Sequence, residues 1–294
     1  MTQGVSVVLE SAPVFSSALS LRINLMLGLW RSRVRRKLMG AHVTHMLTDS
    51  YNGKLLVPVA DGVIGRKLAV HGEYDRSHVE QVLRMVDPSA RVAFIGSHIG
   101  TLVIPVAKKV ARVAAIEANP DTFLTLQMNV LLNSCSNVEL IHCAVSDAAG
   151  TVQFVKNTHN TGGSKALPPG KDFEYFYDSP EVVQVRCETA DVLLADFRPT
   201  HVIVDIEGAE FKALAGMSKL LTSCSVLIVE FVPNHIDHIA QVSCEDFLRR
   251  IPERFRQFRL FDSAEIVGRD SLPNLAKEAR RRNYYGGADL VCMP

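Results

Sequence analysis

Residues 91–120, RVAFIGSHIGTLVIPVAKKVARVAAIEANP, decide the predicted fold. The apolar runs at 92–95 and 113–116 are each short enough to be one buried parallel strand. Between them lie a glycine turn and an apolar-periodic segment that predicts a helix of about two to three turns. The second strand ends on an acid, Glu117. This order is typical of the first half of a nucleotide-binding α/β unit.

The turn after the first strand suggests which nucleotide binds. Gly96 and Gly100 let the backbone approach a ligand closely, and Glu117, about 20 residues further on, suits the two hydroxyls of a ribose. A dinucleotide fingerprint would need glycine at the positions of His98 and Thr101, and no G-K-S/T follows for a P-loop. A ribose ligand without pyrophosphate fits better, and S-adenosylmethionine is the commonest. On this stretch alone, a nicotinamide enzyme and a structural βαβ unit stay open.

The composition narrows the protein class. The chain has 294 residues, of which 47% are hydrophobic, and this is enough for a large buried core. Its net charge of +1 gives no general argument for a nucleic-acid partner. None of the six cysteines forms a C-x-x-C pair, which is typical of reduced, buried thiols in a cytosolic protein. We therefore expect a cytoplasmic protein that does not bind nucleic acid.

Residues 1–50 are expected to form an N-terminal helical arm. The segment 14–30 is apolar apart from several serines, Arg22 and Asn24, and the basic run RSRVRRK follows at 31–37. This segment is too short and too polar to span a bilayer, and no cleavage site of a secretory signal follows it. Two interpretations stay open. The arm is an amphipathic helix that packs on the domain or on a second subunit of a homodimer, or it makes a peripheral contact with an anionic membrane surface.

The remainder of the chain, 51–294, is expected to form one domain. Short alternating pieces at 48–72 predict a hairpin. Further strands are predicted at 138–143, 201–205, 226–230, 256–261 and 289–293. The helices between them indicate a parallel, doubly wound α/β sheet. The long segment 157–184 is rich in glycine, proline and aromatic residues, which favours either a lid over a substrate pocket or a mobile surface excursion.

Five motifs stand in an order that resembles the FkbM-type methyltransferases. They are FIGSHIG at 94–100, EANP at 117–120, the asparagines at 129 and 133, AVSD at 144–147 and DIEGAE at 205–210. The resemblance spans about 51–231. It implies a class I, Rossmann-like methyltransferase with a seven-stranded, mostly parallel sheet behind the N-terminal helical and hairpin extension. It also implies S-adenosylmethionine as the cofactor and oxygen as the usual methyl acceptor.

The resemblance implies a role for each matching position. Gly96, Ser97, His98 and Gly100 would line the methionine end of the cofactor; Glu117 would accept from the ribose hydroxyls, with Ala118 and Asn119 beside it; Ala144 and Val145 would lie by the adenine; Asp205 would lie beside the reactive methyl. The glycine pair and serine at 162–164 resemble a family loop over the site.

Methyl transfer is an in-line displacement at an activated sulfonium. The protein mainly positions the acceptor and excludes water, and a general base helps when the acceptor is a hydroxyl. Asp205 is the first candidate for this base, followed by Glu207 and His235. For Glu207 and Glu210 a structural interpretation competes, because carboxylates in the first turn of a helix interact favourably with its dipole.

A metal and a nucleic-acid substrate are not predicted. Asp205, Glu230 and Asn234 offer oxygen ligands for Mg²⁺, but the sequence holds no concentrated ligand set. No N/D-P-P-Y motif for amino or base methylation is present. The sequence therefore predicts an S-adenosylmethionine-dependent methyltransferase that acts on a hydroxyl of a small molecule, a sugar or a lipid-like acceptor.

Departures from the family pattern support the first of two alternatives, whereas the missing glycines at His98 and Thr101 argue against the second. Phe94 replaces the acid that begins the family's glycine motif and helps to hold the cofactor, and Ile203 replaces a family lysine. His98 stands where the family has asparagine, and it either compensates by hydrogen bonding or is an ordinary surface-turn residue. The first alternative is a degenerate, non-catalytic binding or scaffold protein. The second is a nicotinamide-dependent oxidoreductase.

Overall fold

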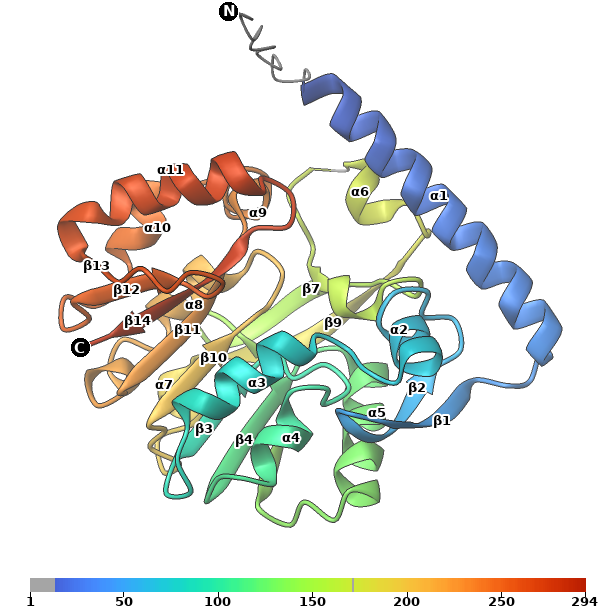
Figure 1. The fold of residues 1–294 in the computed structure, drawn as a ribbon, viewed down its shortest axis with the longest axis horizontal. Helices are drawn as coiled ribbons and strands as arrows, with labels where there is room; N and C mark the ends of the chain where they lie inside the picture. Colours follow the sequence, from blue (N-terminus) through green and yellow to red (C-terminus); the bar gives the residue numbers. More distant parts are fainter. Residues whose placement is uncertain (1–13, 171) are drawn as a thin grey trace, which may run out of the picture.

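The central sheet of the computed structural model carries eight strands in the order β13-β12-β14-β11-β10-β3-β4-β5 (Figure 1). Their bounds are β3 (Arg91–Ile95), β4 (Arg112–Glu117), β5 (Val138–His142), β10 (His201–Val204), β11 (Val226–Phe231), β12 (Gln257–Leu260), β13 (Val267–Gly268) and β14 (Ala288–Met293). The structure describes residues 14–170 and 172–294, so the first part of the predicted arm, 1–13, lies outside the described residues.

The predicted fold class is confirmed, with one strand more than expected. Strands β3, β4, β5, β10 and β11 pair in parallel, whereas β14 runs antiparallel to both β11 and β12. The eighth strand is β13, two residues that pair with β12 at the edge of the sheet. A pairing this short carries no hydrophobic period, and for this reason the sequence did not reveal it.

Two helical layers cover the two faces of this sheet (Figure 1). One layer holds α2 (Ile64–His71), α3 (Arg76–Met85), α4 (Val103–Ala107) and α5 (Pro120–Leu132), and the other holds α7 (Ala190–Leu193), α8 (Glu210–Ala215), α10 (Cys244–Arg249) and α11 (Leu272–Arg282). Along β3, Val92 and Phe94 pack toward the first layer, and Ala93 and Ile95 pack toward the second. This alternation is the side-chain period of a strand buried on both faces.

Helix α4 is shorter than predicted, at five residues. Pro105 lies in its middle and has no N–H with which to bond the carbonyl of Thr101, four residues earlier. That carbonyl instead accepts a hydrogen bond from the Asn52 side-chain amide at 2.9 Å. The turn is thereby fixed from outside the helix.

The N-terminal part consists of a helix and the predicted hairpin. Helix α1 (Val14–Met39) precedes β1 (His45–Ser50), which pairs antiparallel with β2 (Gly53–Pro58). Strand β1 falls within the segment assigned to the arm by the sequence. Asn129 on α5 fastens the hairpin, because its side chain accepts from Leu56 N at 2.7 Å and donates to Leu56 O at 3.1 Å. These two hydrogen bonds account for Asn129, one of the two asparagines in the family motif.

A second, four-stranded sheet lies beside the first, in the order β6-β9-β7-β8. Its strands are β6 (Ala144–Val145), β7 (Gly150–Lys156), β8 (Lys165–Ala166) and β9 (Glu181–Glu188). The segment 157–184, expected to be a loop, contains β8, the 3-10 helix η1 (Thr161–Gly163), α6 (Phe173–Phe176) and the start of β9. The three short elements β8, η1 and α6 were missed because two- to four-residue pieces show no hydrophobic period.

Two further predictions concern the cysteines and the possibility of a membrane-spanning helix. All six cysteines are buried and unpaired, as the sequence predicted. Among the helices of the described ranges, none combines the length and the apolar character that crossing a bilayer requires.

Candidate functional site

A cavity of about 450 Å³ opens at the carboxyl ends of the central parallel strands. The registers bring these ends level, because Ile95 pairs with Ile116 on β4 and with Val204 on β10. Of the predicted site residues, Gly96, Ser97, His98, Glu117, Ala118, Ala144, Val145, Asp205 and Glu207 line the cavity, whereas Gly100, Asn119 and His235 do not. The volume is typical of a pocket for a small organic ligand.

Gly96 is required by a close approach between two strand ends. Its φ is +90°, and a Cβ at this position would lie 1.7 Å from the backbone oxygen of Asp205. The amides of Gly96 and Ser97 both donate to Ile116 O at 3.0 Å. The turn after β3 is therefore locked between β4 and β10, and only glycine fits there. Gly100 does not border the cavity, since it packs on Leu126 in the core instead.

Glu117 ends β4 as a buried acid with two backbone partners. Its Oε2 accepts from His98 N and its Oε1 accepts from Asn119 N, both at 2.8 Å. Burial raises the pKa of Glu117 to about 7, although these amides oppose the increase. Each carboxylate oxygen can accept more than one hydrogen bond, so acceptor capacity toward the cavity remains.

Asn119 supports the site without lining it. Its Oδ1 accepts from Asp121 N and caps α5, and its Nδ2 donates to Ser164 Oγ at 3.3 Å. Asparagine is a preferred residue at this position because its side-chain oxygen accepts from the free N–H groups of the first helical turn. Its contact with Ser164 connects the turn after β4 to the segment 157–184.

His98 is not a surface-turn residue. It adopts a left-handed backbone conformation with φ +48°, and its Nε2 lies 2.8 Å from Thr161 Oγ1. Burial lowers its pKa, and its Nδ1 is buried with no partner among the described residues. Thr161 in turn donates from its backbone and its hydroxyl to Asp61. Neither Thr161 nor Asp61 was found from the sequence, because the contact joins segments 100 residues apart.

Four carboxylates make one end of the cavity acidic. Asp205 follows β10, Glu207 lies two residues on, Glu230 is in β11 and Asp289 is in β14, and all four line the cavity. Desolvation and the neighbouring carboxylates, Glu207 first, raise the pKa of Asp205 well above its ordinary value. Its side chain is nevertheless exposed to the cavity, so water there moderates the increase. This end suits a cationic ligand.

Glu207 is held in a strained conformation by Glu210. Its φ is +56°, which is uncommon for a residue with a Cβ. The buried Glu210 carboxylate accepts from Ile206 N at 2.8 Å and from Gly208 N at 2.9 Å, and thereby fixes the turn. This agrees with the structural interpretation of Glu210. Strain maintained in this way is typical of functional sites.

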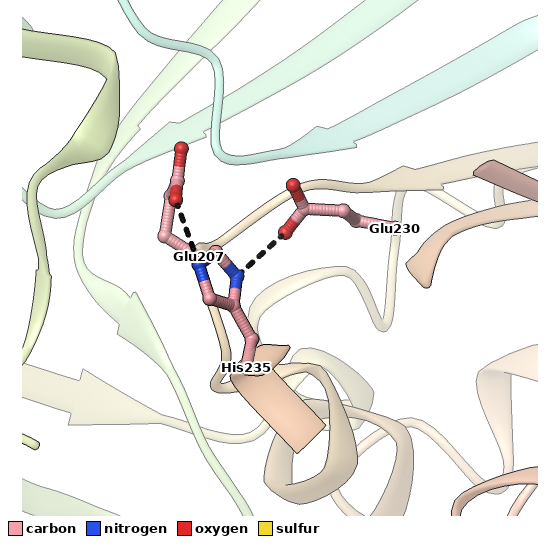
Figure 2. A group of neighbouring side chains, drawn as sticks. All are labelled: Glu207, Glu230 and His235. Atoms are coloured by element: carbon pink, nitrogen blue, oxygen red, sulfur yellow. Dashed lines mark ion pairs between the residues drawn. The ribbon is translucent and has the colours of Figure 1, made fainter. Parts of the chain in front are cut away.

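His235 lies between two carboxylates (Figure 2). It is supplied by α9 (Pro233–His235), with Nε2 3.7 Å from Glu207 Oε2 and Nδ1 3.7 Å from Glu230 Oε2. Burial lowers the pKa of His235 to about 4, so the ring is neutral near pH 7. His235 does not line the cavity, whereas its two neighbours Glu207 and Glu230 do.

The same three side chains are near enough to one another to hold a metal ion, with ligand atoms within 4.8 Å. The two nitrogens of His235 face different carboxylates, and Glu207 already has a positive partner, because Lys165 Nζ lies 3.4 Å from its Oε2. Asn234, one of the oxygen ligands considered from the sequence, is engaged by Tyr175. The group of possible metal ligands in the structure therefore shares only Glu230 with the group considered from the sequence.

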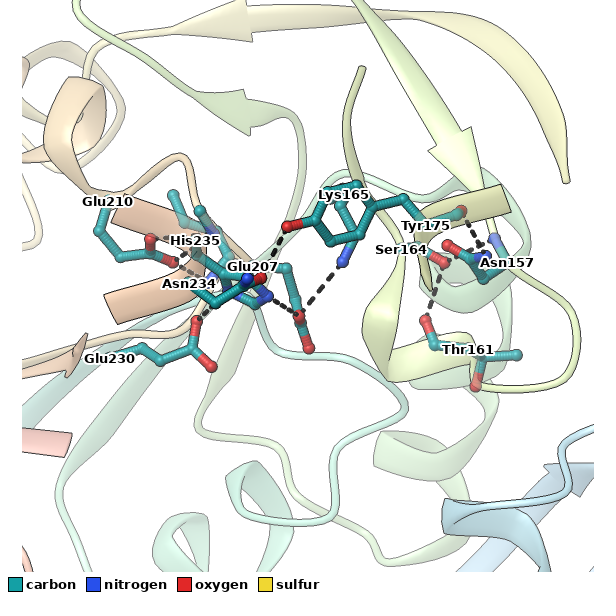
Figure 3. A network of polar contacts seen from close by, with 12 residues as sticks. Asn157, Thr161, Ser164, Lys165, Tyr175, Glu207, Glu210, Glu230, Asn234 and His235 are labelled. Carbon is teal, nitrogen blue, oxygen red and sulfur yellow. Dashed lines mark hydrogen bonds and ion pairs between the residues drawn. The ribbon is translucent and has the colours of Figure 1, made fainter. Parts of the chain in front are cut away.

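The segment 157–184 reaches over the acidic end of the cavity (Figure 3). Lys165 of β8 contacts Glu207, and its ammonium lies 5.1 Å from the ring centre of Tyr175. The Tyr175 hydroxyl donates to Asn234 Oδ1 at 2.8 Å. Lys165 and Tyr175 were missed from the sequence, and only the expected lid indicated them. These contacts join the segment to the residues at the strand ends, and its role as a lid stays a prediction.

Replacing Lys165 by methionine is expected to loosen this segment. The change removes the positive partner of Glu207 and leaves a partly buried carboxylate unpaired, which is unfavourable. We expect faster hydrogen exchange across 157–180 and unchanged exchange in the central strands. Lys277→Met, on the exposed side of α11, is the matched control. Equal protection in both variants would show that Lys165 does not hold the lid.

Comparisons with known proteins relate this chain to methyltransferases. Residues 95–261, which are 167 of the 294 residues, match the family model described as the methyltransferase FkbM domain. Comparison with curated protein sequences gives no match.

Several solved structures resemble this chain. One is methyltransferase FkbM from Methylobacillus flagellatus KT, with 15% identity and a TM-score of 0.46 over 92% of this chain and 59% of that one. Another is the M. jannaschii tRNA m1G37 methyltransferase, with 13% identity and a TM-score of 0.42 over 86% of this chain and 55% of that one. A third is M. jannaschii TYW2 in complex with AdoMet, with 15% identity and a TM-score of 0.43 over 85% of this chain and 84% of that one. The chain spans little more than half the length of the first two.

Proposed function

The chain belongs to the methyltransferase FkbM domain family, and we propose that it transfers a methyl group from S-adenosylmethionine to a hydroxyl of a small molecule, a sugar or a lipid-like acceptor. One observation carries the proposal. A buried acid suited to a ribose, Glu117, and an acidic end suited to a cation, centred on Asp205, border the same cavity.

The residues present fit the cofactor. Glu117 has acceptor capacity left for two ribose hydroxyls, and Ala144 and Val145 offer a partly apolar wall for the adenine. His98 lines the cavity beside Glu117, to which its backbone N–H donates. When bound, S-adenosylmethionine supplies an activated methyl group on a positively charged sulfur.

The missing acid at Phe94 does not leave the cavity without negative charge. Phe94 is buried in the hydrophobic cluster beneath α2 to α5, whereas Asp205, Glu207, Glu230 and Asp289 supply carboxylates at the other strand ends. Attraction for the cofactor's cationic end is therefore provided by other positions. This argues against the degenerate, non-catalytic alternative.

The proposed mechanism uses Asp205 as general base. The acceptor oxygen forms its bond to the methyl carbon while the sulfur–methyl bond breaks, and Asp205 takes the hydroxyl proton. The raised pKa of Asp205 makes it a stronger base than an ordinary aspartate. Glu207 and the neutral His235 position the acceptor side through their mutual contact, and Lys165 and Tyr175 exclude water from above.

A small acceptor is favoured over a nucleic acid. The carboxylates at the acidic end would repel the phosphate groups of a nucleic acid. A cytoplasmic location stays part of the proposal.

Isothermal titration with S-adenosylmethionine, S-adenosylhomocysteine and NADH tests the proposal. We expect both adenosyl ligands to bind at micromolar concentration and NADH to give no heat. Release of S-adenosylhomocysteine in a screen of hydroxylated acceptors would then identify the substrate class. Absence of binding by either adenosyl ligand would remove the enzyme proposal, and NADH binding would favour the oxidoreductase.

Cofactor affinity is expected to depend on pH through Glu117. The carboxylate accepts from hydroxyls only when ionised, and burial raises its pKa to about 7. Protonation therefore competes with binding, so the affinity is full above about pH 8 and falls up to about tenfold per pH unit below about 7. Titrations from pH 5.5 to 8.5 measure this, with the buffer's protonation heat subtracted. A flat profile would mean that Glu117 stays ionised or does not contact the ligand.

A further inference from the structure

Helix α1 carries an apolar face that no described residue covers. Ile23, Met26, Leu27, Trp30, Val34 and Leu38 are exposed, with Trp30 62% and Leu38 83% accessible. Their spacings of three and four residues place them on one side of the helix. Figure 1 shows α1 along the outside of the molecule, beside α2 and α6. An exposed apolar face of this length is typical of an interaction site.

The opposite side of the same helix is the one that packs on the domain. Leu29 and Ser32 are buried, and the Arg35 guanidinium donates to Val59 O and to Asp61 O. Ser32 Oγ lies 2.9 Å from His159 Nδ1. The helix therefore already has its contact with the domain, and the apolar face points away from it.

The charges beside the apolar face are all positive. Arg31, Arg33 and Lys37 are exposed. At 100° per residue Arg31 and Arg33 fall on the two flanks of the face, and Lys37 falls within it near its C-terminal end. Residues 11–48 contain no aspartate or glutamate. Long basic side chains flanking an apolar stripe can reach anionic headgroups while the stripe enters the acyl boundary. A second copy of the same helix would instead bring like charges together.

We propose that α1 docks this protein on an anionic lipid bilayer, with the Ile23–Leu38 face inserted at the headgroup boundary and Arg31, Arg33 and Lys37 against the headgroups. The helix lies in the surface and does not cross it, in agreement with its many polar residues. Docking does not depend on the proposed chemistry.

Docking has a consequence for the acceptor, which rests on the proposed function. Helix α1 contacts the lid through Ser32 and His159 and through Arg22 and Glu174, whose charged atoms are 3.6 Å apart. Thr161, two residues beyond His159, borders the cavity. The lid side of the cavity would therefore lie near the lipid surface, which suits a lipid-like acceptor.

Trp30 makes docking directly measurable because it is the single tryptophan of the chain. We expect a blue shift of its fluorescence, and flotation of the full chain, with vesicles of phosphatidylcholine and phosphatidylglycerol. Pure phosphatidylcholine should give much weaker binding. Salt at about 1 M, where the screening length is about 3 Å, should also weaken it. No shift and no flotation with anionic vesicles would overturn the proposal.

Matched variants separate the apolar face from the charges. Leu27→Ser with Val34→Ser should abolish the shift, whereas Val70→Ser with Val192→Ser, at two more exposed valines on other helices, should keep it. Arg33→Gln with Lys37→Gln should weaken binding about 30-fold, since each basic residue near an anionic leaflet contributes roughly fivefold. Lys219→Gln with Lys277→Gln is the charge control.

Sedimentation of the protein without vesicles tests whether a second copy of the chain covers the exposed apolar face of α1. A dimer that Leu27→Ser with Val34→Ser dissociates would overturn the proposal in favour of a second copy. A shift that persists in these serine variants would also overturn it, because the probe would then report a different contact. Cofactor titration of the same variants distinguishes failed docking from a failed enzyme proposal.

Discussion

Glu117→Gln is expected to weaken binding of S-adenosylmethionine and S-adenosylhomocysteine about 100-fold or more. Hydrogen bonds to a charged group contribute about 1.5–3 kcal/mol each, and the proposed ribose contact has two of them. The glutamine side chain is unfavourable at this position for a second reason. Both oxygens of Glu117 accept from backbone amides, so the glutamine NH₂ would face the N–H of either His98 or Asn119.

Isothermal titration measures the loss, and circular dichroism checks that the fold is kept. Glu139→Gln is the matched control, because Glu139 is a half-exposed acid on the neighbouring strand β5. Unchanged affinity in Glu117→Gln would remove the ribose assignment. Loss of binding together with loss of the folded signal would call for Glu117→Ala, which introduces no opposed donor.

The strand-end residues could be predicted because few facts determine them. Apolar runs that end at Glu117 and before Gly96 and Asp205 mark parallel strands, and the ends of parallel strands meet at one edge of a sheet. Nothing beyond the local period and the strand order is needed. The structure brings these three positions to one cavity for that reason.

The residues that close the site could not be predicted, because they depend on packing between distant segments. Lys165 meets Glu207 across 42 positions, and Tyr175 meets Asn234 across 59. Strand β8, which carries Lys165, has two residues and no period to detect. Asp289 was missed for a different reason. Its strand was predicted, but nothing in the sequence indicated that this acid faces the cavity.

The arm was predicted as a helix, but its two faces were not distinguished. Apolar residues lie on opposite sides of α1, so the sequence alone does not show which side the domain covers. Contacts of Arg35 and Ser32 with the domain decide this, and both partners lie in turns with no period of their own. Tertiary structure was needed to recognise the exposed face.

Asp205→Asn is expected to lower kcat about 10²–10⁴-fold with the acceptor found in the screen, the range for loss of a general base. Asparagine has nearly the same shape but takes no proton. The Asp205 backbone oxygen that crowds Gly96 is unaffected. Affinity for S-adenosylhomocysteine, which lacks the sulfonium charge, should change much less than kcat.

Charge loss and proton transfer are separated by Asp289→Asn. Asp289 lines the same cavity and contributes to the raised pKa of Asp205, but its own contact is with His78 at 3.4 Å. Removing its charge should leave most of kcat. The pH profile gives the second readout. A base acts only when deprotonated, so the wild-type rate should rise with pH through the raised pKa of Asp205, and this rise should vanish in Asp205→Asn. Equal losses in the two variants would show that the carboxylates act by charge alone, and Glu207, which also lines the cavity, would then be the next base to test.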